Sequence, residues 1–470
     1  MNFIYYDLVF LTVFAIFIGG FLYFNRENLK KEGLLFLYKA SWGIKLIDKI
    51  GGKHKKVLRV LSYVSIGLGY VLMGTMIWLF LRMIYIYIAY PSVVKAIKIP
   101  PITPLIPYLP QIFHLDFLPN FYFTYWIVIL ALIAIPHEFA HGIFAAANRV
   151  RIKSTGFGFF PFFLPVFLAA FVEQDEKSMT KKSNFAQMAI LSAGTFANVL
   201  TGILFFGVLV LFFSLMFTPA GVIFNTYATA IVPVSDIDSV NGIGIVNHTY
   251  DEVLGLLKDE RLNDILIGDE KYVGVNGVSS DGTLISLYYD SPAVRENLSG
   301  AILEINEVSI TSIDELREEL LKYSPGDKVN IKTVGDKIMT YDITLDKNPY
   351  FDSAWLGIGF NEAQSSGVLG KFYSVLGSFK DEHIYYEPKF DGWSDFVYNL
   401  LWWLVLISFS VALVNMLPVG IFDGGRFFYL TVLSITKSKK IAERSFAFMT
   451  YLFLFLLAVI MFFWFKNFLF

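Results

Sequence analysis

Residues 121–147 read FYFTYWIVILALIAIPHEFAHGIFAAA, an almost wholly apolar stretch that contains His137, Glu138 and His141. A helix needs about 20 apolar residues to cross the hydrocarbon core of a bilayer, so this stretch predicts a membrane-spanning helix. Residues four apart lie on nearly the same side of a helix, and both imidazoles can therefore reach one ion. The stretch predicts a membrane span and a metal site within it.

The residue types of this motif suit metal-assisted hydrolysis. Glu138 follows the first histidine, a position from which it can take a proton from water that the metal activates. Ionisable groups inside a bilayer are costly unless they are paired, and a divalent cation would compensate Glu138 and the two histidines. The alternative is a set of polar groups at a helix–helix contact, each satisfied by its neighbours.

The composition of the whole chain places it in a membrane. Its 470 residues are 55% apolar and 17% charged, whereas soluble domains carry about 25% charged residues. The first apolar stretch contains Asp7 and lacks a basic leading region, so we interpret it as a span and not as a signal peptide. With 121–147, six stretches are long and apolar enough to span, the others being 5–24, 61–90, 186–217, 397–417 and 446–470.

Basic residues set the expected orientation of these spans. Lysine and arginine gather in alternate loops, and such loops face the cytoplasm; the loops are 25–60, 148–185 and 426–444. Both termini and the loop after the fourth span are then extracytoplasmic, and we expect the membrane to be the cell membrane. Between Asp236 and Asp346 the chain has 22 acidic and 9 basic residues, of 40 and 38 in total. This imbalance predicts an acidic extracytoplasmic domain and a basic membrane part, and gives no reason to expect nucleic acid as a partner.

One further apolar run does not fit a span. Residues 156–172 read GFGFFPFFLPVFLAAFV, which is too short and contains Pro161 and Pro165. Two prolines disfavour a straight helix. We predict a re-entrant β-like loop that enters from the cytoplasmic side, where irregular backbone must lie against protein or a wet cavity. An interfacial segment lying on the bilayer is the alternative.

The extracytoplasmic part mixes strands with a helix. Residues 313–322 read IDELREELLK, an amphipathic pattern that predicts a helix. Residues 300–310 and 328–334 read as strands, and we find no internal repeat.

Catalytic zinc takes three protein ligands and a water, so a third ligand is needed. The chain has no cysteine. None of the other histidines lies in an apolar span, so we expect each of them at the surface; they are His54, His114, His248 and His383. Asp423, followed by Gly424 and Gly425, is the better candidate, although an aspartate before two glycines is also typical of an ordinary turn.

The predicted topology favours the metal role of Asp423. His137 lies 16 residues after Phe121, about 24 Å along a helix, in the cytoplasmic part of the bilayer core. Asp423 comes just after the cytoplasmic end of the fifth span. The loop charges therefore place His137, His141 and Asp423 at similar depth.

A further polar residue lies early in the fourth span, in the sequence Gly194-Thr195-Phe196-Ala197-Asn198. Asn198 could donate to a developing oxyanion or to a substrate carbonyl. A hydrogen bond between two helices would explain it equally well.

Together these motifs resemble those of the site-2 protease family. HEFAH (137–141) matches the HExxH of that family, and NMLPVGIFDGG (415–425) matches its Asn-x-x-Pro-x-x-x-x-Asp-Gly element. AGTFAN (193–198) matches its Gly-x-x-x-Asn element. The resemblance implies one zinc ion per chain, held by His137, His141 and Asp423, although iron(II) uses similar ligands.

The resemblance also assigns roles to residues around the metal. It implies that Glu138 is the catalytic acid and base, and that Asn198 and Asn415 bind the substrate backbone or the transition state. Segment 156–172 would correspond to the membrane-associated β-structure that presents an edge to the substrate strand.

The second half of the extracytoplasmic part resembles a PDZ domain. Ser291-Pro292-Ala293 is followed by GAILEIN (300–306), by the helix 313–322 and by Pro325-Gly326-Asp327, the order seen in protease-associated PDZ modules. The chain departs from that pattern at 295–300, which reads RENLSG where such modules carry Ala-Gly-Leu. A groove that binds peptide or protein termini by strand addition and a steric gate over the site are equally compatible with the pattern.

The predicted fold is thus a polytopic α-helical membrane protein with six transmembrane helices, a re-entrant β-like loop and an inserted α+β PDZ-like domain. The expected parts are two N-terminal helices, the first part of the catalytic core, the PDZ-like domain, a linker and the second part of the core with the last helix. They are 1–120, 121–217, 218–349, 350–396 and 397–470.

The predicted function is intramembrane zinc proteolysis of single-span membrane proteins in the lipid bilayer, by metal-activated water. One alternative is a membrane metal transporter, which would carry polar residues along a whole path and often inverted repeats. The other is a non-catalytic PDZ-type binding protein, which leaves the motif at His137 and Asp423 unexplained.

Overall fold

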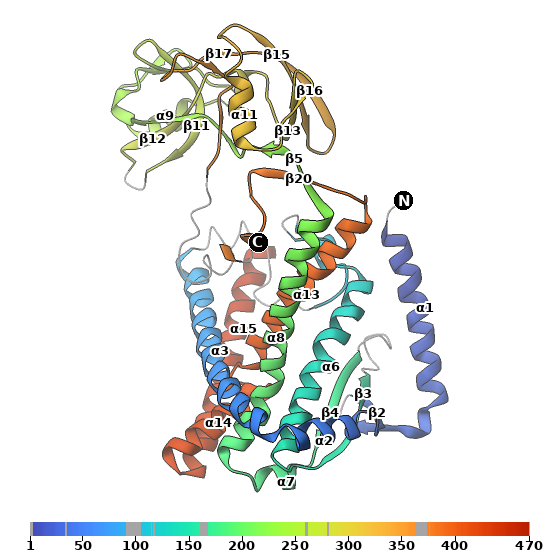
Figure 1. Cartoon of the computed structure of the whole chain (residues 1–470). Coiled ribbons are helices and arrows are strands. Elements are labelled where there is room, and N and C mark those ends of the chain that lie inside the picture. Colours follow the sequence, from blue (N-terminus) through green and yellow to red (C-terminus); the bar gives the residue numbers. More distant parts are fainter. Residues whose placement is uncertain are drawn as a thin grey trace. The chain divides into compact units, whose positions relative to one another are not determined.

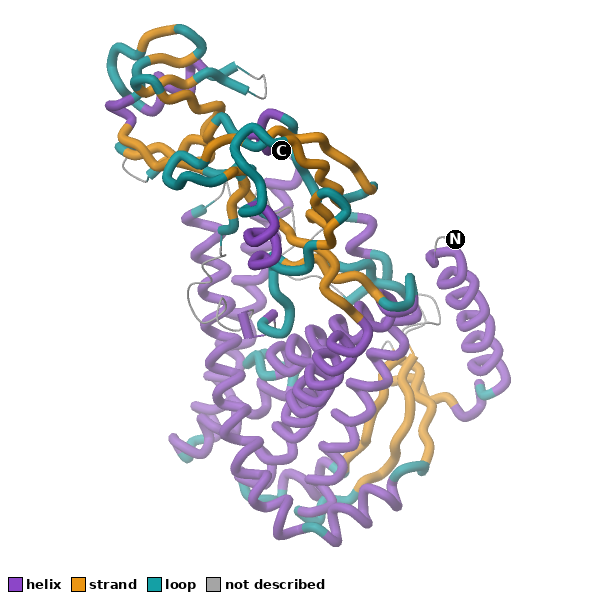
Figure 2. Tube along the Cα trace, turned by 45° about the horizontal axis from the view of Figure 1, so that its top comes forward, coloured by secondary structure: helices purple, strands orange, loops and turns teal. Residues whose placement is uncertain are grey.

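The computed structural model describes residues 3–32, 35–90, 105–113, 115, 118–159, 168–258, 262–279, 282–361, 374–375 and 377–469. It divides the chain into two compact units. The first unit, Met1–Phe212 with Asp395–Phe470, is mainly helical, and the second, Phe213–Ser394, is built mostly of strands (Figures 1 and 2).

Six helices of the first unit are long and apolar enough to cross a membrane, as the sequence predicted. They are α1 (Phe3–Phe24), α3 (Lys55–Ala89), α6 (Phe123–Ala147), α8 (Asn184–Met216), α13 (Trp393–Asn415) and α15 (Lys439–Leu469). Successive helices run in alternate directions, and the N-terminal end of α1 lies at the same end of this unit as the C-terminal end of α15 (Figure 1). The chain is thus a polytopic helical protein with a β-rich insertion.

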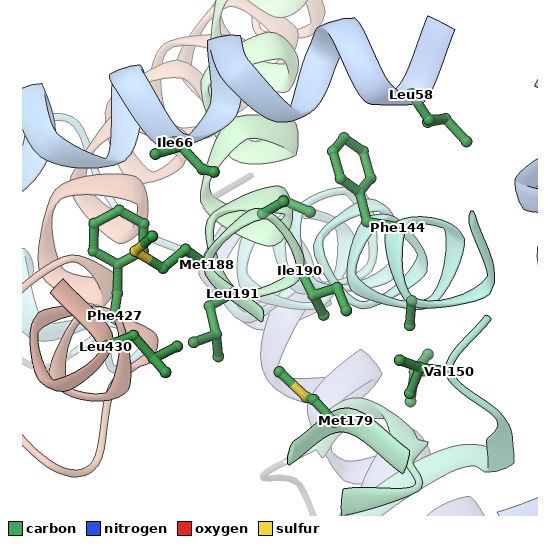
Figure 3. Close-up of a cluster of buried hydrophobic side chains, with 14 of the residues drawn as sticks. Leu58, Ile66, Phe144, Val150, Met179, Met188, Ile190, Leu191, Phe427 and Leu430 are labelled. Carbon is green, nitrogen blue, oxygen red and sulfur yellow. The ribbon is translucent and has the colours of Figure 1, made fainter. Parts of the chain in front are cut away.

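Shorter helices complete the first unit: α2 (Ile44–Lys53), α5 (Leu109–Ile112), α7 (Glu176–Thr180), α14 (Asp423–Thr436) and the 3-10 turn η1 (Arg26–Asn28). A buried cluster joins α3, α6, α8 and α14, with Ile66, Phe144, Ile190 and Phe427 among its members (Figure 3). Burial of such side chains contributes about 1.5–3 kcal/mol each in water, whereas in a bilayer close packing carries more of the stability.

Four antiparallel strands lie beside the helices in the order β1–β2–β3–β4. They are β1 (Leu29–Glu32), β2 (Leu35–Ala40), β3 (Ile152–Phe159) and β4 (Leu168–Gln174). The described parts of the predicted β-like loop 156–172 lie in β3 and β4, and residues 160–167 fall outside the described residues. Gly156 is required here, because a side chain would clash with the carbonyl of Tyr38 on the neighbouring strand.

The second unit contains two β modules, each with its own buried core. The first β module has the sheet order β7–β12–β11–β10–β8–β9 and the helix α9 (Tyr250–Leu256). Its strands are β7 (Thr229–Pro233), β8 (Ser239–Val240), β9 (Ile243–Gly244), β10 (Ile265–Ile267), β11 (Glu270–Val278) and β12 (Leu284–Tyr289), and η3 (Val234–Asp236) follows β7.

The second β module has the sheet order β16–β15–β13–β5–β20 and the helix α11 (Ile313–Leu320). Its strands are β5 (Phe217–Ile223), β13 (Ala301–Ile305), β14 (Val308–Ser309), β15 (Lys328–Val334), β16 (Ile338–Thr344) and β20 (Ile384–Pro388). The first module is inserted between β5 and β13. The remaining elements are α10 (Pro292–Arg295) and the pairs β6 (Thr226–Tyr227) with β19 (Ile358–Gly359) and β17 (Asp346–Lys347) with β18 (Ala354–Trp355).

The two modules share a structural repeat that sequence inspection missed. Asn241 and Asn306 both open a tight turn with positive φ. Each asparagine pairs twice with one residue of a later segment, Asn241 with Asp264 and Asn306 with Asn330. The backbone amide of the asparagine donates to that residue's carbonyl, and its side-chain Oδ1 accepts that residue's backbone amide.

The helices that follow the two turns are capped in the same way. Thr249 accepts the amide of Glu252, and Ser312 accepts the amide of Glu315. Inspection of the sequence, which found no internal repeat, did not detect this structural likeness. The turn and the cap are eight residues apart in one module and six in the other, so the matching residues do not recur at one spacing.

Candidate metal centre and active site

Two histidines on α6 form the base of the site. His137 and His141 are one helical turn apart and both are buried, at 8% and 7% exposure. Their Nε2 atoms are 3.0 Å apart. Two nitrogens of a tetrahedral zinc site lie about 3.3 Å apart when each Zn–N distance is about 2.0 Å, so this pair is close to the required geometry.

Asp423 completes the cluster from a distant part of the sequence. It is the first residue of α14, and its Oδ2 lies 3.2 Å from Nε2 of His141 and 3.6 Å from Nε2 of His137. One ligand atom from each of the three residues lies within 4.8 Å of the others. The lateral proximity that sequence alone left open is thus present.

The two glycines after Asp423 explain how the chain turns to place it. A side chain at Gly424 would clash with the backbone of Met416 and Leu417, and one at Gly425 would clash with the carbonyl of Val419. The first turn of α14 is therefore packed against the turn that follows α13. Burial opposes ionisation of the Asp423 carboxyl, but the two imidazoles outweigh it and hold the pKa of Asp423 below its ordinary value.

Two contacts from α8 show that the residues present fit a metal ion. Nδ1 of His141 lies 2.7 Å from the carbonyl of Ile190, which fixes the proton on Nδ1 and leaves the Nε2 lone pair for a metal. Gly194 faces the same nitrogens, and a side chain there would clash with His137 and His141. The missing side chain keeps open the space beside both nitrogens.

The side chain of Glu138 contacts the sheet beside α6. Its Oε2 accepts a hydrogen bond of 2.9 Å from the backbone amide of Val172, on β4. Strand β4 is the last strand in its sheet order and packs beside α6. The sheet therefore orients the carboxylate that the sequence assigns to acid–base chemistry.

A pocket of about 300 Å³ opens beside the cluster. Its polar lining residues are His137, Glu138, Asn198, Asn415 and Asp423. Asn198 is fully buried, and neither its Oδ1 nor its Nδ2 has a partner among the described residues. A buried amide without partners is costly, and Asn198 carries this cost in the lining of the pocket.

Five of the six residues singled out from the sequence therefore line one pocket, and the sixth, His141, contacts His137 and Asp423. Among the other histidines, His54 and His248 are exposed as expected, and His114 lies outside the described residues. His383 is buried at 7% exposure, so its predicted surface position is wrong. It lies just before β20 and packs against Phe360, a contact that has no signal in the local sequence.

Sequence reasoning gave no role at the site to Gly194, Val172 or Ile190. Gly194 had a signal, because it begins the Gly-x-x-x-Asn element, but only the packing shows what it faces. Val172 and Ile190 act through backbone atoms, which any residue type would supply.

Comparison with known proteins agrees with this geometry. A search of curated proteins gives no match. The model of the family described as "Peptidase family M50" matches residues 125–363 and 383–460, which include every residue of the metal cluster and both β modules. Since the match covers most of the chain, the protein belongs to peptidase family M50, a family of metallopeptidases.

Proposed function

We propose that this protein is an intramembrane zinc endopeptidase that cleaves transmembrane segments of single-span membrane proteins. One observation carries the proposal. Three ligands suited to zinc, a carboxylate and an unpartnered amide surround one pocket, and the helices that supply most of them are long and apolar enough to span a membrane.

The metal ligands would be His137, His141 and Asp423, with one zinc ion per chain. Zinc bound there would act as a Lewis acid on the scissile carbonyl and would make water acidic enough to attack at neutral pH. Iron(II) accepts a similar set of ligands, so metal analysis of the purified protein is part of the test.

The remaining chemistry belongs to the side chains of the pocket. Glu138 takes the proton of the attacking water and passes it to the leaving amine. The Val172 amide holds Oε2 of this carboxylate, so Oε1 is the oxygen directed to the proton. Asn198 donates from Nδ2 to the carbonyl oxygen as negative charge develops, and Asn415 binds the substrate backbone.

A helical substrate hides its peptide bonds and must unwind before it is cut. Among the described residues, strand β4 has a strand on only one side in the sheet order. An extended substrate segment would pair with this edge beside Glu138. This is the role proposed for 156–172 as a re-entrant β-structure.

The second β module is proposed to be PDZ-like and to bind peptide or protein termini. After Ser291 the chain has β13, α11 and β15, the order of strand, helix and strand expected from the sequence. Strand addition would supply the affinity, and a steric gate is the other role compatible with the module. The catalytic core would comprise 121–217 and 397–470.

The orientation follows from the charges. Helices α2, α7 and α14, which belong to the basic segments 25–60, 148–185 and 426–444, lie at one end of the first unit (Figure 1). This end would face the cytoplasm at the proposed cell membrane. The second unit would then be extracytoplasmic. The metal cluster, towards the C-terminal ends of α6 and α13, would lie near the cytoplasmic side.

The proposal is tested by incubating the purified full chain in detergent with a panel of single-span membrane proteins. Wild type is compared with Glu138→Gln. The matched control is Glu27→Gln, because Glu27 is exposed and is far from Glu138 in the sequence. Bound metal is measured in all three proteins. We expect about one zinc per chain in each, with cleavage by wild type and Glu27→Gln alone.

General acid–base catalysis contributes about 10²–10⁴-fold to the rate, which sets the loss expected for Glu138→Gln. Cleavage that survives this substitution at full rate contradicts the role of Glu138. If the folded wild-type protein retains no metal when zinc is supplied, the proposed zinc site, and with it the proposed function, is contradicted.

A further inference from the structure

The pocket beside the metal cluster has a second part that the proposed chemistry does not use. Beyond the polar residues, it is lined by Ile421 and Phe422, just before Asp423, and by apolar side chains of α6, α13 and the segment before α5. We name the part lined by these two helices and this segment the apolar arm; its residues are Leu105, Ile129, Leu130, Ile133, Ala134, Ile407 and Val411. None of these lining residues carries a charge or a hydrogen-bonding side chain.

The arm follows from the spacing of residues on two helices. On α6, residues 129, 133 and 137 lie one turn apart on one face, and so do 407, 411 and 415 on α13. The helices run in the same direction, since Tyr125 contacts Phe396 near both N-terminal ends while Asp423, after α13, reaches His137. In both rows the first two positions are apolar and the third is polar.

This arrangement gives the arm a length and a direction. From His137 back to Ile129 is eight residues, about 12 Å along the helix. The arm therefore extends from the metal cluster towards the N-terminal ends of α6 and α13, through the cluster that buries Ile129 and Ile133.

We propose that the apolar arm receives a large apolar side chain of the substrate residue next to the scissile bond, and that Ala134 sets the size limit of that side chain. The inference rests on the proposed function. It goes beyond it by naming a sequence preference and the residues that determine it.

Two features favour a substrate side chain as the occupant. The arm is continuous with the polar part of the pocket, so a backbone held at Asn198 and Glu138 would place the neighbouring side chain at its entrance. The arm offers nothing to a polar or charged group, which would lose its hydrogen bonds on entry.

Ala134 is the smallest residue of the lining and is half-buried. It lies one helical turn before His137 and Glu138. A larger side chain there would fill the space next to the metal cluster. Ala131 on the same helix is exposed and does not line the pocket, so it provides a matched control.

The test uses the full chain and one cleavable single-span substrate in which the residues on either side of the cut bond are changed in turn to Phe, Leu, Ala and Gly. Values of kcat/KM are compared for wild type, Ala134→Leu, Ala131→Leu and Val411→Ala. Thermal melting and zinc content identify any variant that does not fold.

A methylene group in an apolar pocket is discriminated by about 10-fold or more. We therefore expect wild type and Ala131→Leu to prefer Leu to Ala by at least about 10-fold at one of the two positions. Ala134→Leu should lose this preference while it still cleaves the Ala substrate, and Val411→Ala should shift the preference towards Phe.

Equal cleavage of the Leu and Ala substrates by wild type overturns the inference. It is also overturned if Ala134→Leu loses kcat/KM equally on all substrates and Val411→Ala shows no change of preference. The affinity of Glu138→Gln for the same substrates is measured without turnover. A preference for Leu in that affinity, without cleavage by wild type, supports the arm while it counts against the proposed function.

Discussion

The carboxylate of Asp7 accepts hydrogen bonds from the backbone amide and the hydroxyl of Thr124, at 2.9 and 2.5 Å. Asp7 lies on α1, whereas Thr124 is in the first turn of α6. The same carboxylate accepts the amide of Phe123 and the hydroxyl of Tyr108, at 2.7 and 2.6 Å. One apolar helix therefore caps the start of the helix that holds both histidines, whose own N-cap residue, Tyr122, makes no side-chain cap.

The variant Asp7→Asn is expected to destabilise the helical unit. Asp7 is buried at 1% exposure, and an amide has only one oxygen for four donors. Each buried donor left without a partner costs about 1–3 kcal/mol. Melting of the purified protein in detergent should therefore occur at lower temperature, and Asp48→Asn, at an exposed position on α2, should melt like wild type. Unchanged melting of Asp7→Asn would show that α6 does not depend on this cap.

The variant Gly194→Ala is expected to lose zinc. The added methyl group would clash with the histidine nitrogens that face the metal position. Gly207→Ala on the same helix is the control, because a side chain there meets nothing within 4 Å. Zinc content is measured by atomic absorption after gel filtration. Full zinc content in Gly194→Ala would contradict the assigned position of the metal.

The variant Asn198→Ala is expected to keep zinc and to lose about 10²–10³-fold in kcat, the effect of removing one donor to a developing oxyanion. Asn198→Asp should be equally slow, because it keeps the shape of the side chain but lacks the donor. The control is Asn184→Ala. Asn184 lies on the same helix as Asn198 but outside the pocket, and the change removes its hydrogen bond to Ser434. A loss confined to KM would instead assign Asn198 to substrate binding.

Removal of zinc is expected to lower the stability of the helical unit, because an ion held by His137, His141 and Asp423 would join α6 to the start of α14. A ligand present at 1,000 times its Kd stabilises the folded state by about 4 kcal/mol. A chelator should lower the melting temperature of wild type, and added zinc should restore it. His141→Ala should show neither change, and an equal response to zinc in this variant would place the ion elsewhere.

Much of the first unit could be predicted from sequence because its signals are local. A run of about 20 apolar residues leaves a segment no stable state in a membrane except a helix that satisfies its own backbone. The six spans followed from this rule, and α6 begins within two residues of the predicted start. The helix α11 was predicted for a similar reason, from the apolar face of IDELREELLK.

The strands were predicted less completely. Segment 156–172 was recognised as β-like from its prolines and length. The sequence did not show that β2, near Lys39, pairs with its first strand β3, or that β1, near Lys31, pairs with β2. Pairing between segments more than 100 residues apart depends on where the helices bring them. The repeat in the second unit was missed because its shared residues, an asparagine in the turn and a Thr or Ser cap, stand at different spacings in the two modules.

The sequence by itself determined which residues could bind a metal, because HExxH on a helix places two imidazoles on one side whatever surrounds it. It also determined that this helix is long and apolar enough to lie in a membrane. Only the tertiary structure decided that Asp423 lies beside the two histidines, that Gly194 leaves the space open, that the Val172 amide orients Glu138 and that Asp7 caps α6. These contacts join residues from 34 to 286 positions apart, and no local rule fixes a distance between segments that meet only when the helices pack.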